Sequence, residues 1–501
     1  MSFFNILNID GQLLLPLQII IPLFFGVFVS LIKKHRISYI FSLIILIVNF
    51  LISILIAKEI SITKQLNYNF GNFLPPYGIN YTVDSLTSII LLLVSFFGLI
   101  SFIWGYYSLK LELKNKTHLF NSLFLVCVSG YQGIAITGDA FNLFVFLEIA
   151  SLSSYILISM GPDKRCLTSA FNYLIIGTLG ACFYVLGIGF IYMITGTLNI
   201  EDISSRIKDL QNYNLLYIAI GFITTGLLLK IAIFPLHSWL PRIYTFSPSV
   251  ATVFFSSISS KVSIYIFLKI IVKTLGSTVG ETVYTILNIL ISLSIINILI
   301  GSIKAIKNKD LRNVLAYSSI AQIGYIILAI GIFSEYSIKS AIIFIINHAI
   351  IKGGLFIVVG TILYRYNTTN TKNLSGLMKD SPLLFIGLIV GFASLIGIPG
   401  TAGFISKFTL LISIFKESLW FVGIIIVITS ILPLFYTYKA LSNMVINSTT
   451  NITCQPINKI PIIMQLTIIL IILMNIYLGF NTDIVNNFAS KATQTIFNLK
   501  S

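Results

Sequence analysis

Long apolar stretches recur from one end of the chain to the other, separated by short charged or Pro- and Asn-rich segments. A stretch of about 18 or more apolar residues is long enough to cross a hydrocarbon layer of roughly 30 Å as a helix. The pattern therefore predicts an all-α polytopic membrane protein with about 14 transmembrane helices. The expected spans are residues 13–32, 37–57, 84–108, 119–137, 140–160, 168–195, 215–235, 248–272, 281–303, 311–333, 338–362, 382–410, 417–438 and 462–480.

The composition excludes an ordinary soluble protein. Of the 501 residues, 56% are hydrophobic and only 10% are charged, whereas about a quarter of the residues in soluble domains are charged. The N-terminal segment has no charged region and no small-residue cleavage site, so we expect residues 13–32 to be the first span and not a signal peptide. We attribute the formal net charge of +16 to cationic loops and expect no nucleic acid partner.

Lysine and arginine are unevenly divided between the two sides of the predicted bundle. The side that includes "KKHR" (33–36) holds 18 of the 32 Lys and Arg residues, and the opposite side holds 10. Cytoplasmic loops of membrane proteins carry an excess of Lys and Arg. The split predicts that the "KKHR" side is cytoplasmic and that both termini lie outside.

Several ionisable residues lie well inside the expected spans, where an ionised side chain costs at least ~2.5–3.5 kcal/mol. Such residues usually face the bundle interior, pair with one another and mark ion pathways. The alternative is that each reaches an interface along its aliphatic stem, or fixes helix packing; for a lone histidine a structural role is equally open. The residues concerned are Glu148, Lys230, Lys261, His348, Lys352 and Lys407. Three further histidines are expected in loops, without an assigned role: His35, His118 and His237.

Two of these lysines lie beside residues that break helices. In "LLLKIAIFPLHSWLP", Pro235 follows Lys230 by five residues, and in "GIPGTAGFISKF", Pro399 and Gly400 shortly precede Lys407. Proline removes a backbone donor and clashes with the preceding turn, so spans seven and twelve are expected to be discontinuous. Broken helices at membrane depth occur only where they pack in protein or line a hydrated cavity. A lysine beside each break indicates an ion path, although a break made for packing alone remains the alternative.

The two halves of the chain resemble each other. Residues 169–198 are similar to residues 340–367 at an offset of 171, which suggests two inverted repeats of the kind common in transporters. The expected division is an N-terminal group of three helices, two antiporter-like repeats, and a C-terminal helix with its tail: 1–118, 119–272, 281–440 and 441–501.

One predicted outer loop has an amphipathic pattern. In "NIEDISSRIKDLQ" (199–211), Ile200, Ile203, Ile207 and Leu210 share one helical face, with charges on the other. The segment fits a helix lying along the membrane surface, and it fits a solvated loop helix equally well.

Motifs for cofactors are absent from the sequence. The four cysteines sit singly and form no C-x-x-C pair, which argues against iron–sulfur or zinc ligation. Neither a dinucleotide-binding glycine fingerprint after a strand nor a Walker A motif is present. We expect no cofactor and no metal.

Four segments in combination resemble a known family: "TGDAFNLFVFLEIASLSSYILIS", "KIAIFPLHSWLPRIYTFSPSVATVFFSSISSKVSIY", "LRNVLAYSSIAQIGYI" and "IGIPGTAGFISKFTLL". They are similar to the antiporter-like proton-translocating membrane subunits. These are shared by Mrp-type Na+/H+ antiporters and by respiratory complex I, as its N, M and L membrane-arm subunits. Within the family, "FNLFVFLEI" and "HAIIKGGLFIVVG" look closest to the Mrp D subunit.

The resemblance implies a role for each buried residue. Glu148 matches the family's glutamate on the fifth helix, and Lys230 its partner lysine on the broken seventh. Lys261 matches the central lysine of the eighth helix, His348 falls where the family often has a polar relay residue, and Lys407 matches the terminal lysine or glutamate of the broken twelfth. We expect Glu148 and Lys230 to pair across a hydrated interior.

The implied function is proton translocation in a multisubunit monovalent cation (Na+)/H+ antiporter, in a bacterial cell (inner) membrane. The implied partners are other membrane subunits, protons, Na+ and the lipid bilayer. A second interpretation is a proton-pumping subunit of NADH-quinone oxidoreductase or a membrane hydrogenase, without a redox centre of its own. A third is a passive assembly scaffold whose ionisable residues have lost their role.

Overall fold

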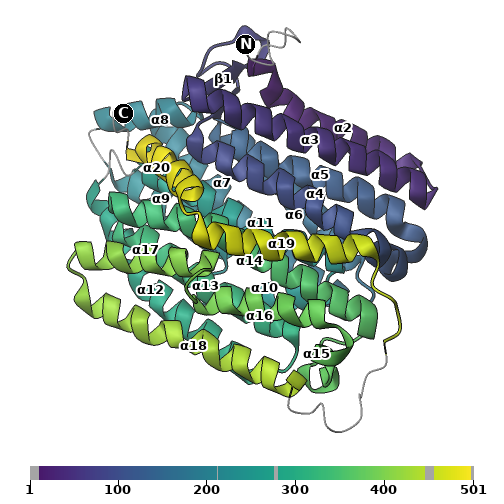
Figure 1. The fold of residues 1–501 in the computed structure, drawn as a ribbon. Helices are drawn as coiled ribbons and strands as arrows, with labels where there is room; N and C mark the ends of the chain where they lie inside the picture. The colour runs from purple at the N-terminus through teal and green to yellow at the C-terminus, as the bar shows by residue number, and fades with distance from the viewer. Residues whose placement is uncertain (1–10, 211–212, 276–279, 446–455, 498–501) are drawn as a thin grey trace.

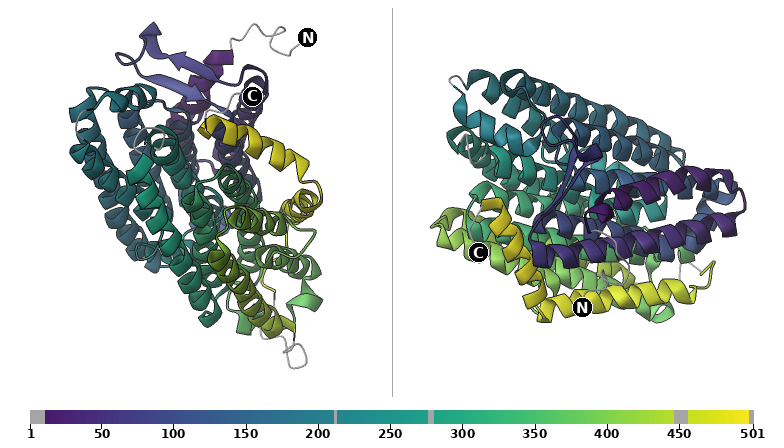
Figure 2. Two further views of the ribbon diagram at one scale, coloured as in Figure 1. Left: turned by 90° about the vertical axis from the view of Figure 1, so that its left-hand side faces the viewer. Right: turned by 90° about the horizontal axis from the view of Figure 1, so that it is seen from above.

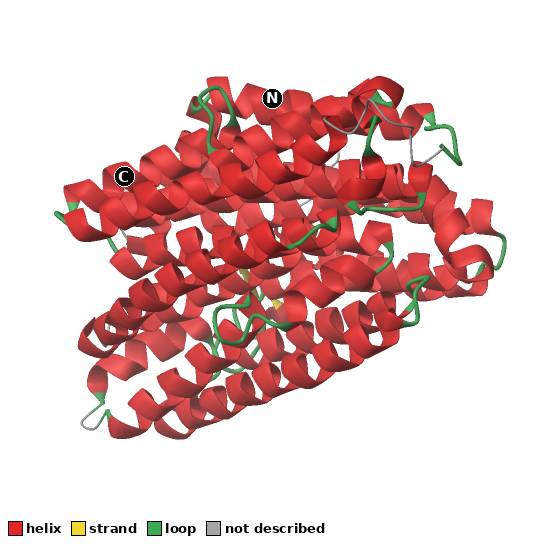
Figure 3. Cartoon of the chain, turned by 90° about the horizontal axis from the view of Figure 1, so that it is seen from below, coloured by secondary structure: helices red, strands yellow, loops and turns green. Residues whose placement is uncertain are grey.

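Helices make up nearly all of the described chain (Figure 3). The computed structural model describes residues 11–210, 213–275, 280–445 and 456–497. The helices that cross the bundle within these ranges are α2 (Leu14–Leu31), α3 (His35–Thr63), α4 (Ser85–Leu113), α5 (Thr117–Ile136), α6 (Ala140–Ser159), α7 (Arg165–Thr195), α9 (Asn214–Ile231) with α10 (Trp239–Phe246), α11 (Ser249–Phe267), α12 (Gly280–Lys307), α13 (Leu311–Ile332), α14 (Glu335–Tyr366), α16 (Pro382–Ile396) with α17 (Ala402–Lys416), α18 (Trp420–Val445) and α19 (Ile462–Phe480).

Twelve helical stretches of the described chain are long and apolar enough to cross a membrane. One of these stretches, Ser85–Ile136, contains both α4 and α5, and a further crossing is built from the two shorter helices α16 and α17. These helices coincide with the about 14 spans that the hydrophobic pattern predicts, so the all-α polytopic membrane fold is confirmed.

Short elements connect the crossings. They are η1 (Gly11–Leu13), β1 (Leu66–Asn69), η2 (Phe70–Asn72), β2 (Asn80–Val83), η3 (Lys114–Lys116), α8 (Ile200–Arg206), η4 (Ile207–Asp209), the π-helix η5 (Leu268–Leu275), η6 (Thr371–Leu374), α15 (Leu377–Asp380) and α20 (Asp483–Phe497). The β hairpin, α8 and α20 lie at one end of the bundle, which we call the hairpin end, and α15 lies at the opposite end, the α15 end (Figures 1 and 2).

The hairpin was not predicted from the sequence. Strands β1 and β2 pair antiparallel, with Leu66 opposite Val83 and Asn69 opposite Asn80. Each strand has four residues, which is too short for an alternating pattern to stand out from the surrounding apolar sequence. The hairpin leads directly into Asp84, whose side chain accepts a hydrogen bond from the Thr87 N–H and so begins α4.

The amphipathic segment after the sixth crossing forms a short helix, as its pattern predicts. Asn199 accepts hydrogen bonds from the first N–H groups of α8 and starts the helix. Ile200, Ile203 and Ile207 are all buried against the rest of the protein. The apolar face of this segment therefore packs on the bundle itself.

Two helices occupy the centre of the bundle. Every residue of α11 is buried, and α14 is buried over nearly all of its length. The outer helices α2, α3, α7, α18 and α19 instead carry many exposed Ile, Leu and Phe side chains, which is the surface expected to face lipid. A charged side chain on α11 or α14 is therefore enclosed by protein.

A structural repeat is present at the offset that the sequence predicts. Asp139, at the start of α6, forms an isolated antiparallel bridge with Asn199, and Asp310, at the start of α13, forms the same bridge with Asn370. Both members of one pair lie 171 residues before those of the other. Because α13 is the fifth crossing after α6, the two copies lie at opposite ends of the bundle, as inverted repeats require. The domain boundaries remain a prediction.

Candidate proton path

The seventh crossing is interrupted between α9 and α10, as Pro235 predicts. Side chains replace the backbone hydrogen bonds that the break removes. Asn297 Oδ1 accepts a hydrogen bond from the Phe234 N–H at 3.0 Å, and Trp239 Nε1 donates to the carbonyl of Leu229 at 3.0 Å. The break is thus held by protein groups, the condition for irregular backbone at membrane depth.

The twelfth crossing is interrupted between α16 and α17, as Pro399 predicts. The Gly403 N–H donates to Ser394 Oγ at 3.0 Å, which ties the start of α17 to the end of α16. Asn347 of α14 donates to the carbonyl of Ala402 at 2.9 Å. The two predicted discontinuities are therefore confirmed, and each is built from neighbouring polar side chains.

Lys230 and Glu148 come together from different helices but form no direct ion pair. The Lys230 ammonium, in the last turn of α9, donates to Ser151 Oγ at 2.6 Å. Ser151 lies three residues after Glu148 on the same face of α6, and Glu148 Oε1 is buried with no hydrogen-bond partner among the described residues. The ammonium thus has the Ser151 hydroxyl as its hydrogen-bond partner, while Glu148 acts on it through space. The pairing of Glu148 with Lys230 across a hydrated interior remains a prediction.

A small cavity joins this cluster to α11. It measures about 20 Å³, enough for one water molecule. Ser151 and Lys230 line it on one side, and Ser259 and Ser263 of α11 line it on the other. Lys261 lies between these two serines in the chain.

Lys261 is enclosed at the centre of the bundle and is 1% exposed. Its ammonium donates to the backbone carbonyl of Ser256, five residues earlier on α11. It lies close enough to His348 and Lys352 of α14 for their charges to interact. The lysine therefore has a neutral oxygen as its hydrogen-bond partner and other ionisable groups as neighbours.

His348 and Lys352 lie one turn apart on α14, and both are buried. Neither ring nitrogen of His348 has a hydrogen-bond partner within the described protein. Lys352 donates to the carbonyl of Leu315 at 2.9 Å and to the hydroxyl of Ser318. A buried imidazole with two free nitrogens is unusual for a structural histidine, because each unpaired polar atom is unfavourable in an apolar interior.

Lys407 lies beyond α14, on α17. Its ammonium donates to the carbonyl of Ile396, the last residue of α16, at 2.9 Å, and lies 5.4 Å from the ring centroid of Tyr325. Its neighbour in the chain, Ser406, accepts a hydrogen bond from Asn347 at 2.9 Å, and Asn347 precedes His348. Polar groups thus run from α14 to the broken twelfth crossing.

The five predicted residues lie on successive helices that pack against one another. We call them the row: Glu148, Lys230, Lys261, His348 and Lys407. α6 leads to α9, α9 packs against α11, α11 against α14, and α14 against α17. Glu148 is partly buried. The exposed fractions of the three lysines and the histidine are low, so none reaches water along its own stem: Lys230 7%, Lys261 1%, His348 1% and Lys407 7%. This arrangement can pass protons between neutral and charged amines with water in the gaps.

Sequence reasoning missed a buried polar pair at the first break. His237 lies in the turn between α9 and α10, as expected. It is nevertheless only 4% exposed, and its Nε2 lies 3.2 Å from the Lys304 ammonium of α12. The break folds His237 into the bundle, where a helix more than sixty residues later reaches it. Only this long-range packing identifies the residue.

A second missed group lies at the hairpin end of α11. Lys269 is buried, and Lys273 forms an ion pair with Asp84 at 2.7 Å. Burial alone would favour the protonated acid, but Lys273 outweighs it and holds the pKa of Asp84 below its usual range. The available signal was the spacing of Lys261, Lys269 and Lys273, which differ by multiples of four residues.

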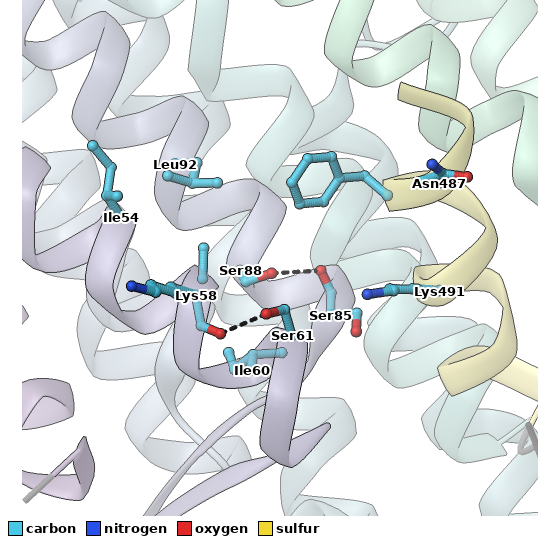
Figure 4. Close-up of a pocket in the computed structure, with 11 residues that line it drawn as sticks. Ile54, Lys58, Ile60, Ser61, Ser85, Ser88, Leu92, Asn487 and Lys491 are labelled. Carbon is cyan, nitrogen blue, oxygen red and sulfur yellow. Dashed lines mark hydrogen bonds between the residues drawn. The ribbon is translucent and has the colours of Figure 1, made fainter. Parts of the chain in front are cut away.

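The largest cavity among those described lies away from the row. It measures about 400 Å³ and opens between α3, α4 and α20, where its lining includes Ile54, Lys58, Leu92, Asn487 and Lys491 (Figure 4). Among the described residues, no three His, Cys, Asp or Glu side chains gather where they would hold a metal ion.

Comparisons with known proteins agree with the fold. The family model described as NADH:quinone oxidoreductase/Mrp antiporter, TM matches residues 137–433. The chain is 35% identical to the N subunit of the NADH-quinone oxidoreductase of Desulforudis audaxviator, over 75% of this chain and 74% of that protein. It is 29% identical to the D subunit of the Na(+)/H(+) antiporter of Alkalihalophilus pseudofirmus, over 85% of each.

A solved structure has the same fold. A chain in the structure of the Mrp complex from Dietzia sp. superposes with a TM-score of 0.87, at 22% identity, over 97% of this chain and 98% of that one. The family model covers more than half of the sequence, and the matched segment includes every residue of the row. The chain therefore belongs to the NADH:quinone oxidoreductase/Mrp antiporter transmembrane family.

Proposed function

We propose that this protein is the proton-translocating membrane subunit of a multisubunit monovalent cation/proton antiporter. Protons move along Glu148, Lys230, Lys261, His348 and Lys407. The observation that carries the proposal is the enclosure of these residues on successive helices, with neutral oxygens as the partners of the lysine ammoniums. The antiporter relative, which aligns over most of both chains, favours this reading.

The chemistry of the row is proton exchange between amines. Burial disfavours the charged form of any lysine, so an enclosed lysine gives up its proton more readily than one in water. Protonation of Lys261 repels a proton on Lys230 or His348, and its deprotonation draws one toward it. A charge change at one position thus alters proton affinity at the next, without movement of a helix.

Glu148 is the member of the row at its α6 end. A carboxylate near the Lys230 ammonium favours the protonated amine. Ser151 holds that ammonium one turn from Glu148, so a small rotation of the lysine exchanges a hydroxyl partner for a carboxylate. We propose that this exchange opens and closes the Lys230–Glu148 pair during transport.

We place the protein in a bacterial cell (inner) membrane with both termini outside, on the excess of Lys and Arg on the "KKHR" side. Na+ is the proposed counter-ion, and other membrane subunits are the proposed partners. A tag at either end tests the orientation in sealed spheroplasts. A tag that an impermeant protease cannot reach would contradict it.

A second candidate function is a proton-pumping subunit of an NADH-quinone oxidoreductase. The relative with 35% identity bears that name, which favours this reading. Vesicles that contain the intact complex separate the two. An imposed Na+ gradient drives a pH change in an antiporter, whereas NADH and a quinone drive it in the oxidoreductase.

The same vesicles test the row. Glu148→Gln and Lys261→Met are expected to abolish the ion-driven pH change, and Glu148→Asp to retain part of it. Matched controls are Glu417→Gln and Lys208→Met, because both side chains are exposed. Rates are corrected for the amount of complex in the membrane. Transport at the parental rate by Glu148→Gln would contradict the proton-path proposal.

A further inference from the structure

A polar cavity opens at the hairpin end, outside the row. It measures about 280 Å³, which holds several water molecules. Exposed Gln65 and Glu201 lie at its rim, and Asp84, Thr87 and Lys269 lie deeper. Three of its walls come from α8, the start of α4 and the π-helix η5.

Lys269 is 8% exposed and forms the floor of this cavity. Its ammonium donates to the backbone carbonyls of Thr137 at 2.7 Å and Ala135 at 3.2 Å. The carboxylates of Asp84 and Glu201 act on it through space, while the ion pair of Asp84 is with Lys273. Lys269 thus resembles the lysines of the row, whose hydrogen bonds also go to neutral oxygens.

Lys269 stands on the same helix face as the central lysine. Lys261, Tyr265, Lys269 and Lys273 follow one another at intervals of four residues, which places them on one side of the helix. Eight residues at ~1.5 Å each separate Lys261 from Lys269 by roughly 12 Å along the axis. Tyr265 lies midway between them in the chain, and the Lys269 ammonium lies 5.6 Å from the centroid of its ring.

The wall between Tyr265 and the cavity is a chain of hydrogen-bonding groups. The Tyr265 hydroxyl lies 2.9 Å from Thr87 Oγ1 and donates to the Ala135 carbonyl at 2.8 Å. Thr87 donates to Asp84 at 2.9 Å, and Lys273 donates to the other oxygen of Asp84 at 2.7 Å. Ala135 therefore accepts from both Tyr265 and Lys269, which joins the two.

We propose that the cavity and Lys269 form the aqueous passage that connects Lys261 with the hairpin end of the bundle. The passage rests on the proposed function, since it serves protons that reach Lys261. In the outward step the Lys269 ammonium gives its proton to a cavity water, which leaves a neutral amine and a hydronium ion. Uptake is the reverse. The Asp84 carboxylate attracts the hydronium ion, and Lys273 keeps Asp84 ionised.

Labelling the cavity wall tests the passage without removing any of its charges. Ser204 of α8 lines the cavity, and the adjacent Ser205 is exposed and does not. Each is replaced by cysteine in a background whose four natural cysteines are substituted and whose transport is retained. The purified complex is treated with a bulky methanethiosulfonate, reconstituted, and assayed for ion-driven pH change.

We expect labelled Ser204→Cys to lose at least about tenfold in transport and labelled Ser205→Cys to keep the unlabelled rate, because only the first label fills the cavity. Full transport by labelled Ser204→Cys, alongside an inactive Lys261→Met, overturns the passage and leaves the proposed function standing. Full transport by Lys261→Met overturns the proposed function and the passage with it.

Substitution of Lys269 separates proton exchange from packing. Lys269→Arg keeps a cation that donates to the same carbonyls, but guanidinium does not release its proton in proteins. Lys269→Arg and Lys269→Met are therefore both expected to transport at least about tenfold more slowly, with the complex present in normal amount in the arginine variant. Restoration of the parental rate by arginine would assign Lys269 a packing role and refute the proposal.

Discussion

Lys407 contacts the end of α16 in the structure and exchanges a proton in the proposed mechanism, and substitution by methionine or arginine separates these two roles. Its ammonium donates to the Ile396 carbonyl at the end of α16 and lies over the Tyr325 ring. It thereby closes the break in the twelfth crossing. In the proposed mechanism it also takes up and releases a proton. Arginine keeps the cation and its donors, whereas methionine keeps the length and removes the charge.

The expected change in the free energy of unfolding on substitution of Lys407 follows from these contacts. A hydrogen bond from a charged group contributes ~1.5–3 kcal/mol, and a cation at a helix C-terminus adds ~0.3–1 kcal/mol. Methionine loses both, but it also recovers the desolvation cost of the buried ammonium. We expect a net loss of ~1–2 kcal/mol in the free energy of unfolding. Arginine is expected to keep most of that stabilisation.

Thermal unfolding and ion-driven pH change are measured on the same purified complex. Lys407→Met is expected to unfold at a lower temperature and to be inactive. Lys407→Arg is expected to unfold near the parental temperature and also to be inactive, because guanidinium stays protonated. Lys372→Met, which changes an exposed lysine, is the control. Parental transport by Lys407→Arg would refute proton exchange at this position, and unchanged unfolding of Lys407→Met would refute the helix-end contact.

Single contacts give three more predictions. Ser151→Ala removes the acceptor of Lys230, and transport in vesicles is expected to fall about tenfold, because a hydrogen bond to a charge is worth ~1.5–3 kcal/mol. Gly403→Ala is expected to lower the amount of folded protein in membranes, since an added Cβ overlaps a backbone carbonyl of α16. Burial by itself raises the pKa of Asp380, but its hydrogen bonds and the charge of Arg365 outweigh burial and hold that pKa below the usual 3.8. Its stabilising contribution is therefore present above about pH 4 and lost as the pH falls through the lowered pKa, so Asp380→Asn should destabilise the protein at neutral pH and remove that loss on acidification.

Each has a control and an outcome that would contradict it. Ser151→Thr keeps the hydroxyl and should transport normally; equal rates for Ser151→Ala would make the contact dispensable. Gly189→Ala meets open space and should accumulate normally, so an equally abundant Gly403→Ala would contradict the packing argument. A pH dependence of unfolding that Asp380→Asn leaves unchanged would show that this carboxylate is not the group lost on acidification.

The crossings and breaks were predictable because they depend on local sequence. Apolar runs must be as long as the hydrocarbon is thick, and proline acts on the turn in which it stands. The hairpin was not predictable, because its strands of four residues carry no period of their own. Only the pairing in the folded structure, of Asn80 with Asn69 and of Val83 with Leu66, shows where the hairpin lies.

The residues of the row were predictable for a different reason. A carboxylate or ammonium inside an apolar span is unfavourable, so its presence already indicates a partner or a path. The identity of the partner is a separate matter. Ser151 is one of many serines in the chain, and a serine inside an apolar helix is not unusual enough to indicate a contact. The sequence therefore suggested Glu148 as the partner of Lys230, and the Ser151 hydrogen bond was not predicted. His237 was expected in a loop, and Lys269 stands three residues before the end of the span predicted at 248–272, where a lysine can extend to the interface.

The inverted repeat explains why the two lysines beside the breaks lie on different sides of them in the sequence. Lys230 precedes its break, in α9, which begins at the hairpin end. Lys407 follows its break, in α17, and α17 ends at the hairpin end because α16 starts beside α15 (Figure 1). Since the repeats run in opposite directions, both lysines fall in the half of the bundle nearer the hairpin end. The proposed passage from Lys261 on α11 to Lys269 on η5 therefore lies on the same side of the bundle as both lysines.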